Sequence, residues 1–222
     1  MVSDECCQRN AVEMRVIIKE AYPVMRIGLK RLMEEFWPCQ VIGCKDIDQA
    51  IDAVSGQSAD LLIFGMHNDE VEDMKRLIAK ARTCWQHHDI RVLVMSEMCE
   101  SVYAPLCVLA GAKGFMPLNE REEVVLSAIK SVLLGGIFVS RPLARHPVMQ
   151  QVVDYGELKI LDLFSRRERE IAEYLLNNTS LQDIGDKLNL SYTTVATYRN
   201  RILKKANIRR ISHLSKLLGH GY

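Results

Sequence analysis

Short apolar runs alternate with amphipathic stretches through the first 136 of the 222 residues, and this alternation constrains the fold most. The runs are rich in Val, Ile and Leu, and the third is continuously hydrophobic, as expected of a strand buried on both faces. The apolar runs lie at 14–19, 39–45, 59–65, 89–96 and 113–118, and the helical stretches at about 24–36, 46–56, 70–81, 101–110 and 120–134. Five strands that alternate with five helices predict a parallel sheet covered on both faces, a doubly wound α/β domain.

A joint follows this first domain. Gly135 and Gly136 end the last of its helices, and Pro142 and Pro147 interrupt the segment after them, as expected of a linker with at most a helical stretch. From Leu158 on, the pattern is helical throughout. We therefore expect a flexible tail over 1–13, an α/β domain over 14–136, a linker over 137–157 and an all-α domain over 158–222.

Three serines predict the helix starts in this last part of the chain. Ser165 is followed three residues on by Glu168, the pair that forms a capping box, and Ser180 and Ser191 are also suited to cap helices. The connection before Ser191 is so short that the second and third helices must cross steeply, as in a helix-turn-helix. The four helices are expected over about 165–177, 180–188, 191–206 and 211–218.

The outer face of the third of these helices carries hydroxyl, amide and guanidinium groups, which bind phosphate oxygens and base edges. From Glu157 to the end, 12 Lys and Arg stand against 7 Asp and Glu, a net charge of +5, so the first 156 residues carry −4 of the overall +1. No Asp or Glu occurs from Leu190 to Tyr222. Many amphipathic helices have a polar outer face, but a hydroxyl-rich start, a basic end and the lack of acid together favour DNA binding.

The segment from Phe164 to Ile208 is similar to the LuxR-type helix-turn-helix of the NarL/FixJ response regulators, a family of bacterial transcription regulators. The matching motifs are S-x-R-E-x-E-I at 165–171, x-x-I-x-x-x-L at 182–188 and S-x-x-T-V at 191–195. The resemblance implies a four-helix DNA-binding domain in which the third helix reads the major groove.

The resemblance also implies which residues contact DNA. Ala196, Thr197 and Asn200 fall at the positions that contact bases in the family. Family members commonly carry Lys at position 196 and His at position 198, whereas this chain has Ala196 and Tyr198, so the target sequence cannot be carried over. The expected contacts to the DNA backbone come from Thr193, Thr194, Tyr198, Arg199, Arg201 and Lys204.

The first 120 residues resemble the receiver domain of the same family, a (βα)5 flavodoxin-like fold. A receiver that accepts phosphate needs an aspartate at the end of its third strand and two acids after the first strand to hold Mg²⁺. It also needs a Ser or Thr after the fourth strand and a lysine after the fifth. The reason is charge balance, because an aspartate attacks a phosphoryl group only where cations offset the crowded negative charge.

Three of these four requirements are not met at the matching positions. Glu20 follows the first strand with Ala21 beside it, Gly65 stands at the acceptor position, and Leu118 replaces the lysine, while Ser96 fits. We therefore predict a degenerate receiver (pseudo-receiver) that works independently of phosphorylation.

Other modes of control stay open. A conventional phosphorylated receiver would require a shifted alignment, which is disfavoured because Asp60 precedes the third strand and Asp69 lies four residues beyond it. The chain could act as a homodimer on two half-sites, as an auxiliary regulator that heterodimerises with another response regulator, or as a ligand sensor. Some family members bind cyclic di-GMP through a W-[FLM]-[TS]-R pattern near residues 138–141, so Phe138 and Arg141 are candidate ligand residues, although packing is the favoured interpretation.

Several classes of protein are disfavoured. The six histidines are scattered, no GxSxG, HExxH or Walker-type motif occurs, and seven cysteines without a CxxC pair favour reduced thiols over metal binding or redox sensing. No apolar run approaches the roughly 18 residues of a membrane span, and the N-terminus lacks the apolar stretch of a signal peptide. We expect a cytoplasmic, non-enzymatic regulator without cofactor, metal or membrane contact. Its expected partners are double-stranded promoter DNA and a second response-regulator chain, and RNA polymerase stays open.

Overall fold

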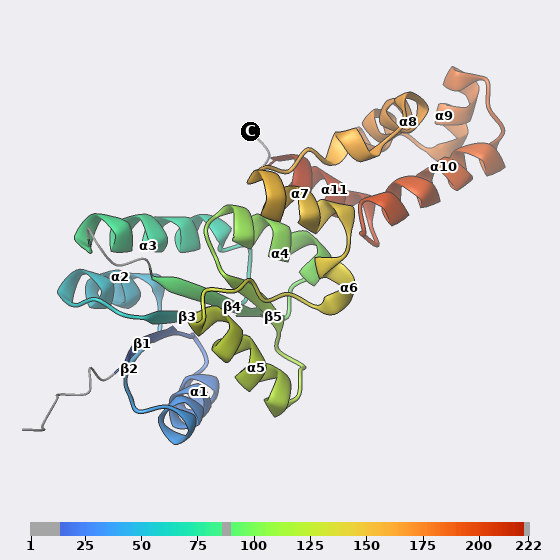
Figure 1. The fold of residues 1–222 in the computed structure, drawn as a ribbon. Helices are drawn as coiled ribbons and strands as arrows, with labels where there is room; N and C mark the ends of the chain where they lie inside the picture. Colours follow the sequence, from blue (N-terminus) through green and yellow to red (C-terminus); the bar gives the residue numbers. More distant parts are fainter. Residues whose placement is uncertain (1–13, 86–89, 220–222) are drawn as a thin grey trace, which may run out of the picture.

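The computed structural model describes residues 14–85 and 90–219 (Figure 1). The expected flexible tail over 1–13 and the histidines at 87 and 88 lie outside the described residues. Within the described residues, five parallel strands form one sheet in the order β2-β1-β3-β4-β5, the flavodoxin-like order. The strands are β1 (Met14–Lys19), β2 (Cys39–Cys44), β3 (Leu61–Met66), β4 (Arg91–Ser96) and β5 (Gly114–Pro117).

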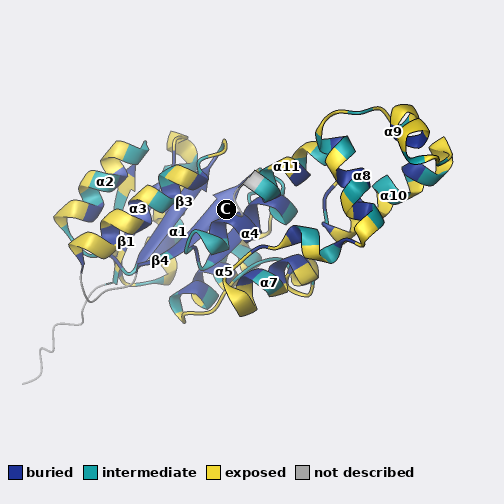
Figure 2. Cartoon of the chain, turned by 90° about the horizontal axis from the view of Figure 1, so that it is seen from above, coloured by how far each residue is buried: buried dark blue, intermediate teal, exposed yellow. Residues whose placement is uncertain are grey.

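Helices cover both faces of this sheet. The helices α1 (Pro23–Phe36) and α5 (Glu122–Leu133) pack on one face, and α2 (Ile47–Gly56), α3 (Val71–Cys84) and α4 (Glu100–Leu109) pack on the other. Side chains along β1 point alternately to the two faces of the sheet. Ile17 packs on the face covered by α2, α3 and α4, and its neighbours Val16 and Ile18 pack on the face covered by α1 and α5. All six residues of β3 are buried, and Figure 2 shows the sheet as the most buried layer of this part of the chain. The prediction of a doubly wound α/β domain is confirmed.

The segment after α5 is more ordered than a linker pattern suggests. The amide of Phe138 donates to the carbonyl of Lys113 at 2.9 Å, and the amide of Phe115 donates to the carbonyl of Phe138 at the same distance, so this stretch extends the edge of the sheet beside β5. Two helices follow, α6 (Arg141–Ala144) and α7 (Pro147–Tyr155), where the sequence indicated one helical stretch at most. The segment is held in place because Val148, Met149 and Val152 of α7 are buried in the apolar cluster.

The rest of the chain is helical, as predicted. A 3₁₀ turn η1 (Ile160–Leu163) precedes α8 (Arg166–Leu176), α9 (Leu181–Leu188), α10 (Tyr192–Lys205) and α11 (Ile211–Gly219). The capping box predicted at Ser165 and Glu168 is present, and Ser180 and Ser191 cap α9 and α10 through their side chains. The prediction of an all-α domain after the α/β domain is therefore confirmed.

The turn between α9 and α10 depends on one close approach. Asn189 has a φ of 54°, in the left-handed region that ends helices. The backbone then folds back over Gly185, so a Cβ on this glycine would lie 2.7 Å from the carbonyl oxygen of Leu190. Only a residue without a side chain lets the two segments come this near.

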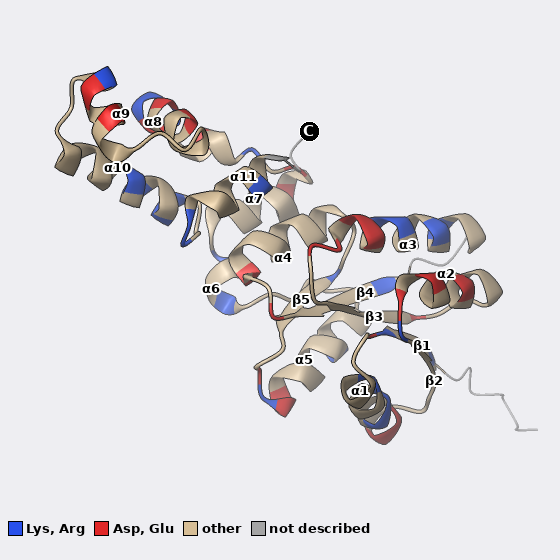
Figure 3. Cartoon of the chain, turned by 180° about the vertical axis from the view of Figure 1, so that it is seen from behind, with Lys and Arg blue, Asp and Glu red and all other residues tan. Residues whose placement is uncertain are grey.

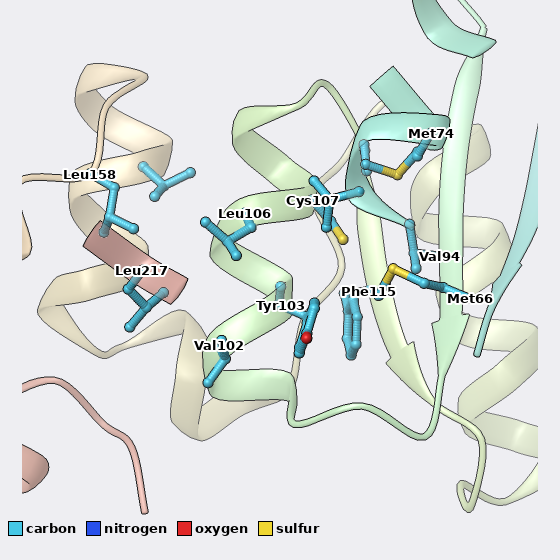
Figure 4. Packing of buried hydrophobic residues seen from close by; sticks show 14 of the residues in the cluster. Met66, Met74, Val94, Val102, Tyr103, Leu106, Cys107, Phe115, Leu158 and Leu217 are labelled. Atoms are coloured by element: carbon cyan, nitrogen blue, oxygen red, sulfur yellow. The ribbon is translucent and has the colours of Figure 1, made fainter. Parts of the chain in front are cut away.

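The helical part packs against α4 of the α/β part, and the two share one apolar cluster (Figure 4). On one side of α4, Val102 and Leu106 face Leu158 and Leu217. On the other side, Tyr103 and Cys107 of the same helix lie toward β3, β4 and β5. α4 is thus an inner helix, covered by the sheet and by the helical part. No helix of the described residues has both the length and the apolar character to cross a membrane.

Candidate nucleic-acid interface and receiver site

The position of α10 is fixed at its start and along its inner face. The hydroxyl of Ser191 accepts a hydrogen bond from the amide of Thr194 at 3.1 Å, which satisfies one of the free N–H groups at the helix start. Val195, Ile202 and Ala206 are fully buried. With one face held in this way, helical spacing dictates which side chains point away from the core.

The outward face of α10 is a stripe of polar residues at helical spacing. Thr193, Thr197, Asn200 and Lys204 are all exposed and follow one another at intervals of four, three and four residues. The hydroxyl of Thr197 donates to the carbonyl of Thr193 at 2.9 Å. Because its proton is used in this way, Thr197 presents oxygen lone pairs and a methyl group to solvent, and Asn200 presents an amide that can both donate and accept.

The other predicted DNA contacts fall in different surroundings. Ala196, Thr194 and Tyr198 are half-buried, while Arg201 is exposed and its guanidinium lies 5.7 Å from the centre of the Tyr198 ring. Arg199 is half-buried and lines a groove with residues from the end of α8 and the start of α11. Arg199 therefore shares the side of α10 that carries Val195 and Ile202, away from the outward stripe.

The end of α10 is basic and is tied to α8. Figure 3 shows Lys and Arg but no Asp or Glu along α10, whereas α8 and α9 carry charges of both signs. The ammonium of Lys205 lies 2.7 Å from a carboxylate oxygen of Glu168, which is 3% exposed. Burial by itself would raise the pKa of Glu168, but the hydrogen bonds from Lys205 and Ser165 outweigh it and hold the pKa below its ordinary value. The negative charge needed for the pair is therefore kept at neutral pH.

A second polar cluster lies at the carboxyl ends of β1 and β3, where chemistry collects in sheets of this kind. Lys19 is 3% exposed. Its ammonium donates to the carbonyl of Gly65 at 2.9 Å and to a carboxylate oxygen of Glu70 at 2.8 Å, and it lies 4.5 Å from the centre of the Phe64 ring. A buried cation is thus neutralised by a carboxylate next to the predicted acceptor position.

The carboxylate of Glu20 occupies the space beside Gly65. Glu20 is fully buried, and its Oε1 accepts from the amide of Tyr22 at 2.8 Å and lies 2.7 Å from Nε2 of His67. Its Oε2 has no hydrogen-bond partner among the described residues. A Cβ on Gly65 would lie 2.1 Å from this oxygen and 3.1 Å from the carbonyl of Lys19.

The remaining residues of the predicted degenerate phosphorylation site are Ala21, Ser96 and Leu118. Ala21 is exposed. Ser96 is fully buried, and its hydroxyl donates to the carbonyl of Met66 and accepts from the amide of Met98. Leu118 lines a cavity at the ends of β4 and β5 with Ser96. The structure brings Gly65 and Glu20 together, with Ser96 on the neighbouring strand.

The candidate ligand residues Phe138 and Arg141 lie in different surroundings. Phe138 is half-buried against the α1–α5 side of the sheet, and Arg141 is exposed at the start of α6. No group of three or more His, Cys, Asp or Glu within residues 14–85 and 90–219 could hold a metal ion. Burial raises the pKa of the Cys107 and Cys44 thiols, which keeps them protonated and unreactive.

An ion pair connects the two parts of the chain. The ammonium of Lys216 on α11 lies 2.6 Å from a carboxylate oxygen of Asp69 and 2.6 Å from the Tyr103 hydroxyl. These hydrogen bonds raise the pKa of Lys216. Asp69 directly precedes Glu70, the partner of Lys19, so the polar cluster of the sheet borders the contact with α11.

The sequence analysis did not single out Lys19, Glu70, Lys216 or Gly185. Lys19 was visible as a charge at the end of an apolar strand, but its partners Glu70 and Gly65 lie about fifty positions away. Nothing in the local pattern pairs Lys216 with Asp69, 147 residues apart. Gly185 could have been found, because a glycine inside a predicted helix often marks a close contact.

The sequence and fold are similar to those of known regulators. Residues 162–218 match the family model described as bacterial regulatory proteins, luxR family. A protein of Pseudomonas aeruginosa named "Putative transcriptional regulator" is 30% identical over 200 residues, which cover 90% of this chain and 94% of that protein. The response regulator GacA of Pseudomonas viridiflava is 26% identical over 210 residues, with 94% and 97% covered.

Solved structures show the same architecture. A structure of two RcsB dimers bound to two parallel DNAs superimposes with a TM-score of 0.67 at 17% identity and covers 95% of this chain and 100% of that one. RcsB of Salmonella enterica serovar Typhimurium, bound to the promoter rprA, gives a TM-score of 0.62 at 18% identity, with 94% and 99% covered. At these identities the likeness shows the fold.

A receiver-like sheet followed by a LuxR-type helix-turn-helix defines a response regulator. The chain belongs to the LuxR family of bacterial regulatory proteins and is a DNA-binding response regulator of the NarL/FixJ type.

Proposed function

We propose that this protein is a cytoplasmic transcription regulator that binds promoter DNA through α10 and whose receiver works without phosphorylation. The observation that carries the second part is the occupied acceptor position: Gly65 has no side chain to phosphorylate, and the carboxylate of Glu20 fills the space beside it. The family positions for the second Mg²⁺-binding acid and for the lysine hold Ala21 and Leu118.

The charges around Gly65 support the same proposal. Lys19 and Glu70 neutralise each other at 2.8 Å, so the ammonium that contacts Gly65 is already paired and does not offset the charge of a phosphoryl group. The two acids that a shifted alignment would use are also engaged: Asp60 accepts from the amide of Arg15 at 2.9 Å, and Asp69 pairs with Lys216. Asp60 also precedes β3, at the end of the strand opposite to Gly65.

For DNA recognition we propose that Ala196, Thr197 and Asn200 contact bases. An asparagine amide can pair with two groups of adenine, and small apolar groups such as the Ala196 methyl suit the methyl group of thymine. Contacts to the DNA backbone are assigned to the remaining predicted residues. Arg199 would make its contact from the surface groove that it lines with α8 and α11. The contact set is Thr193, Thr194, Tyr198, Arg199, Arg201 and Lys204.

We further propose that two copies engage two half-sites about one helical turn apart. RcsB, which shares the fold, is described as binding DNA as dimers. A second copy raises the effective concentration of the first at the DNA, so a modest contact per half-site suffices. Heterodimers with another response regulator would use the same principle, and footprinting with and without a candidate partner separates the two.

Incubation with acetyl phosphate and Mg²⁺, followed by mass spectrometry of the intact chain, tests the independence from phosphorylation. The expected result is an unchanged mass, because no carboxylate stands at the acceptor position. A phosphorylated species approaching one phosphate per chain contradicts the proposal. A relative with an intact acceptor aspartate, treated in parallel, shows that the reagent is active.

A further inference from the structure

A hollow with a basic rim lies between the linker and the second half of α10. Its volume is about 520 Å³, within the range of about 300–1,000 Å³ of small-molecule sites. One side comes from the linker and η1, and the other side comes from the last turns of α10. The lining residues are His146, Pro147, Leu163, Arg201, Lys204 and Lys205.

The positive charges that line this hollow are not balanced by carboxylates in the lining. Three cationic side chains and no carboxylate line it. Lys205 is paired with Glu168, whereas no carboxylate of the described residues forms an ion pair with Arg201 or Lys204, which are both exposed. Two cations one turn apart attract an anion.

The rest of the hollow is apolar. Pro147 and Leu163 contribute hydrocarbon surface, and the methylene stems of the lysines and the arginine add to it. A ligand that fits both parts carries a negative head and an apolar body.

His146 lies where the two sides of the hollow meet. Its Nδ1 accepts from the amide of Val148 at 3.3 Å, and the ring lines the hollow together with Lys204 of α10. Burial lowers the pKa of His146, with the backbone of Lys204 opposing this effect. At neutral pH the ring is therefore uncharged, and it does not add to the positive charge of the hollow.

We propose that this hollow binds a small organic anion, with a phosphate or carboxylate head at Arg201 and Lys204 and an apolar body against Pro147 and Leu163. Binding itself is independent of the proposed function. Its consequence rests on that function: because Arg201 and Lys204 are also assigned to the DNA backbone, a bound anion competes with a DNA phosphate and lowers the affinity for DNA.

Titration of the full chain, without DNA, in ¹⁵N–¹H correlation NMR tests the site. The probes are 1-naphthyl phosphate, 1-naphthoate, inorganic phosphate and 1-naphthol. Both naphthyl anions are expected to saturate and to shift the amides of His146, Leu163 and Lys204. The stronger of the two identifies the preferred head group. Inorganic phosphate and 1-naphthol are expected to bind at least about tenfold more weakly, a difference of about 1.4 kcal/mol, because each lacks half of the ligand.

A charge reversal at the rim tests the site, and the same reversal outside the hollow is its matched control. Lys204→Glu is expected to weaken the binding of 1-naphthyl phosphate by at least about tenfold. Arg209→Glu makes the same change at an exposed residue that does not line the hollow, and it is expected to leave the affinity within about twofold. Equal weakening by both variants, or equal affinity for inorganic phosphate or for 1-naphthol, overturns the proposal.

DNA binding is then measured separately with saturating naphthyl phosphate. Lower DNA affinity supports the competition. If the anion binds as described but DNA affinity is unchanged, the site stands and the assignment of Arg201 and Lys204 to the DNA backbone fails. If Lys204→Glu abolishes DNA binding but leaves anion binding intact, the site is overturned and the DNA assignment stands.

Discussion

Single residues on the outward face of α10 divide into short side chains that suit base edges and a long cation that suits phosphate. Thr197 and Asn200 are short, exposed and one helical turn apart, so their polar atoms stay near the helix axis, as the proposed contacts to base edges in the major groove require. Lys204 is longer, lies at the end of the helix and carries a point charge that suits the DNA backbone.

Replacing Thr197 and Asn200 together by alanine is expected to remove sequence preference. A lost bidentate contact to a base costs about 1–3 kcal/mol of discrimination, so affinity for the target falls toward that for unrelated DNA. Genome-wide occupancy of wild type and double variant measures this directly. Unchanged occupancy would show that α10 does not read the DNA as assigned.

Lys204→Ala is the counterpart of that variant. Removing a phosphate contact is expected to weaken binding to all sequences alike and to reduce the slope of log affinity against log salt by about 1. Fluorescence anisotropy with target and scrambled duplexes at several salt concentrations distinguishes the two effects. A change confined to the target duplex would contradict the assignment of Lys204 to the backbone.

Among the elements, the turn between α9 and α10 sets the angle at which α10 is presented. Gly185 allows the carbonyl of Leu190 to lie where a side chain would otherwise be. The neighbour is backbone, which cannot rotate away, so added volume must displace the whole turn.

Gly185→Ala is therefore expected to destabilise the helix-turn-helix by about 1–3 kcal/mol and to weaken DNA binding. Gly28→Ala is the matched control, because Gly28 also lies in a helix but a Cβ there meets nothing within 4 Å, so the change is expected to be neutral or stabilising by up to about 1 kcal/mol. Urea unfolding of both variants gives the comparison. Equal effects would mean that the close approach at Gly185 does not matter.

The elements themselves could be predicted from the sequence because their signals are local. The apolar run of β3, the capping box at Ser165 and the serine before α10 each lie within a few residues of the structure that they specify. The polar cluster at Gly65 could be foreseen only in part, because the Lys19–Glu70 pair and the position of the Glu20 carboxylate depend on how β1 and β3 lie side by side. The burial of α4 on two sides had a signal, since Val102 to Cys107 include no charged residue.

At the scale of the whole molecule, the question is what holds the helical part against the sheet. The Lys216–Asp69 pair is about 37% exposed on each side, and exposed ion pairs contribute about 0–1 kcal/mol. Leu106 of α4 is 2% exposed and faces Leu158 and Leu217. Truncation of such a buried leucine costs about 2–5 kcal/mol, so the apolar contact outweighs the ion pair.

Leu106→Ala is accordingly expected to loosen the contact far more than Lys216→Ala. Hydrogen exchange of α7 and α11 amides should accelerate strongly in the first variant and only slightly in the second. Lys80→Ala, at an exposed site on α3, controls for loss of a surface charge. If Lys216→Ala were the more disruptive change, the ion pair would be the main connection between the two parts.

The central claim is that DNA binding by this regulator does not depend on phosphorylation of its receiver. The most direct measurement is the affinity of the full chain for its target DNA, with and without beryllofluoride and Mg²⁺ at constant salt. We predict the same affinity and the same stoichiometry under both conditions, because Gly65 offers no carboxylate and Glu20 fills the adjacent space. A reproducible increase in affinity or a change in oligomeric state on adding beryllofluoride would contradict the account.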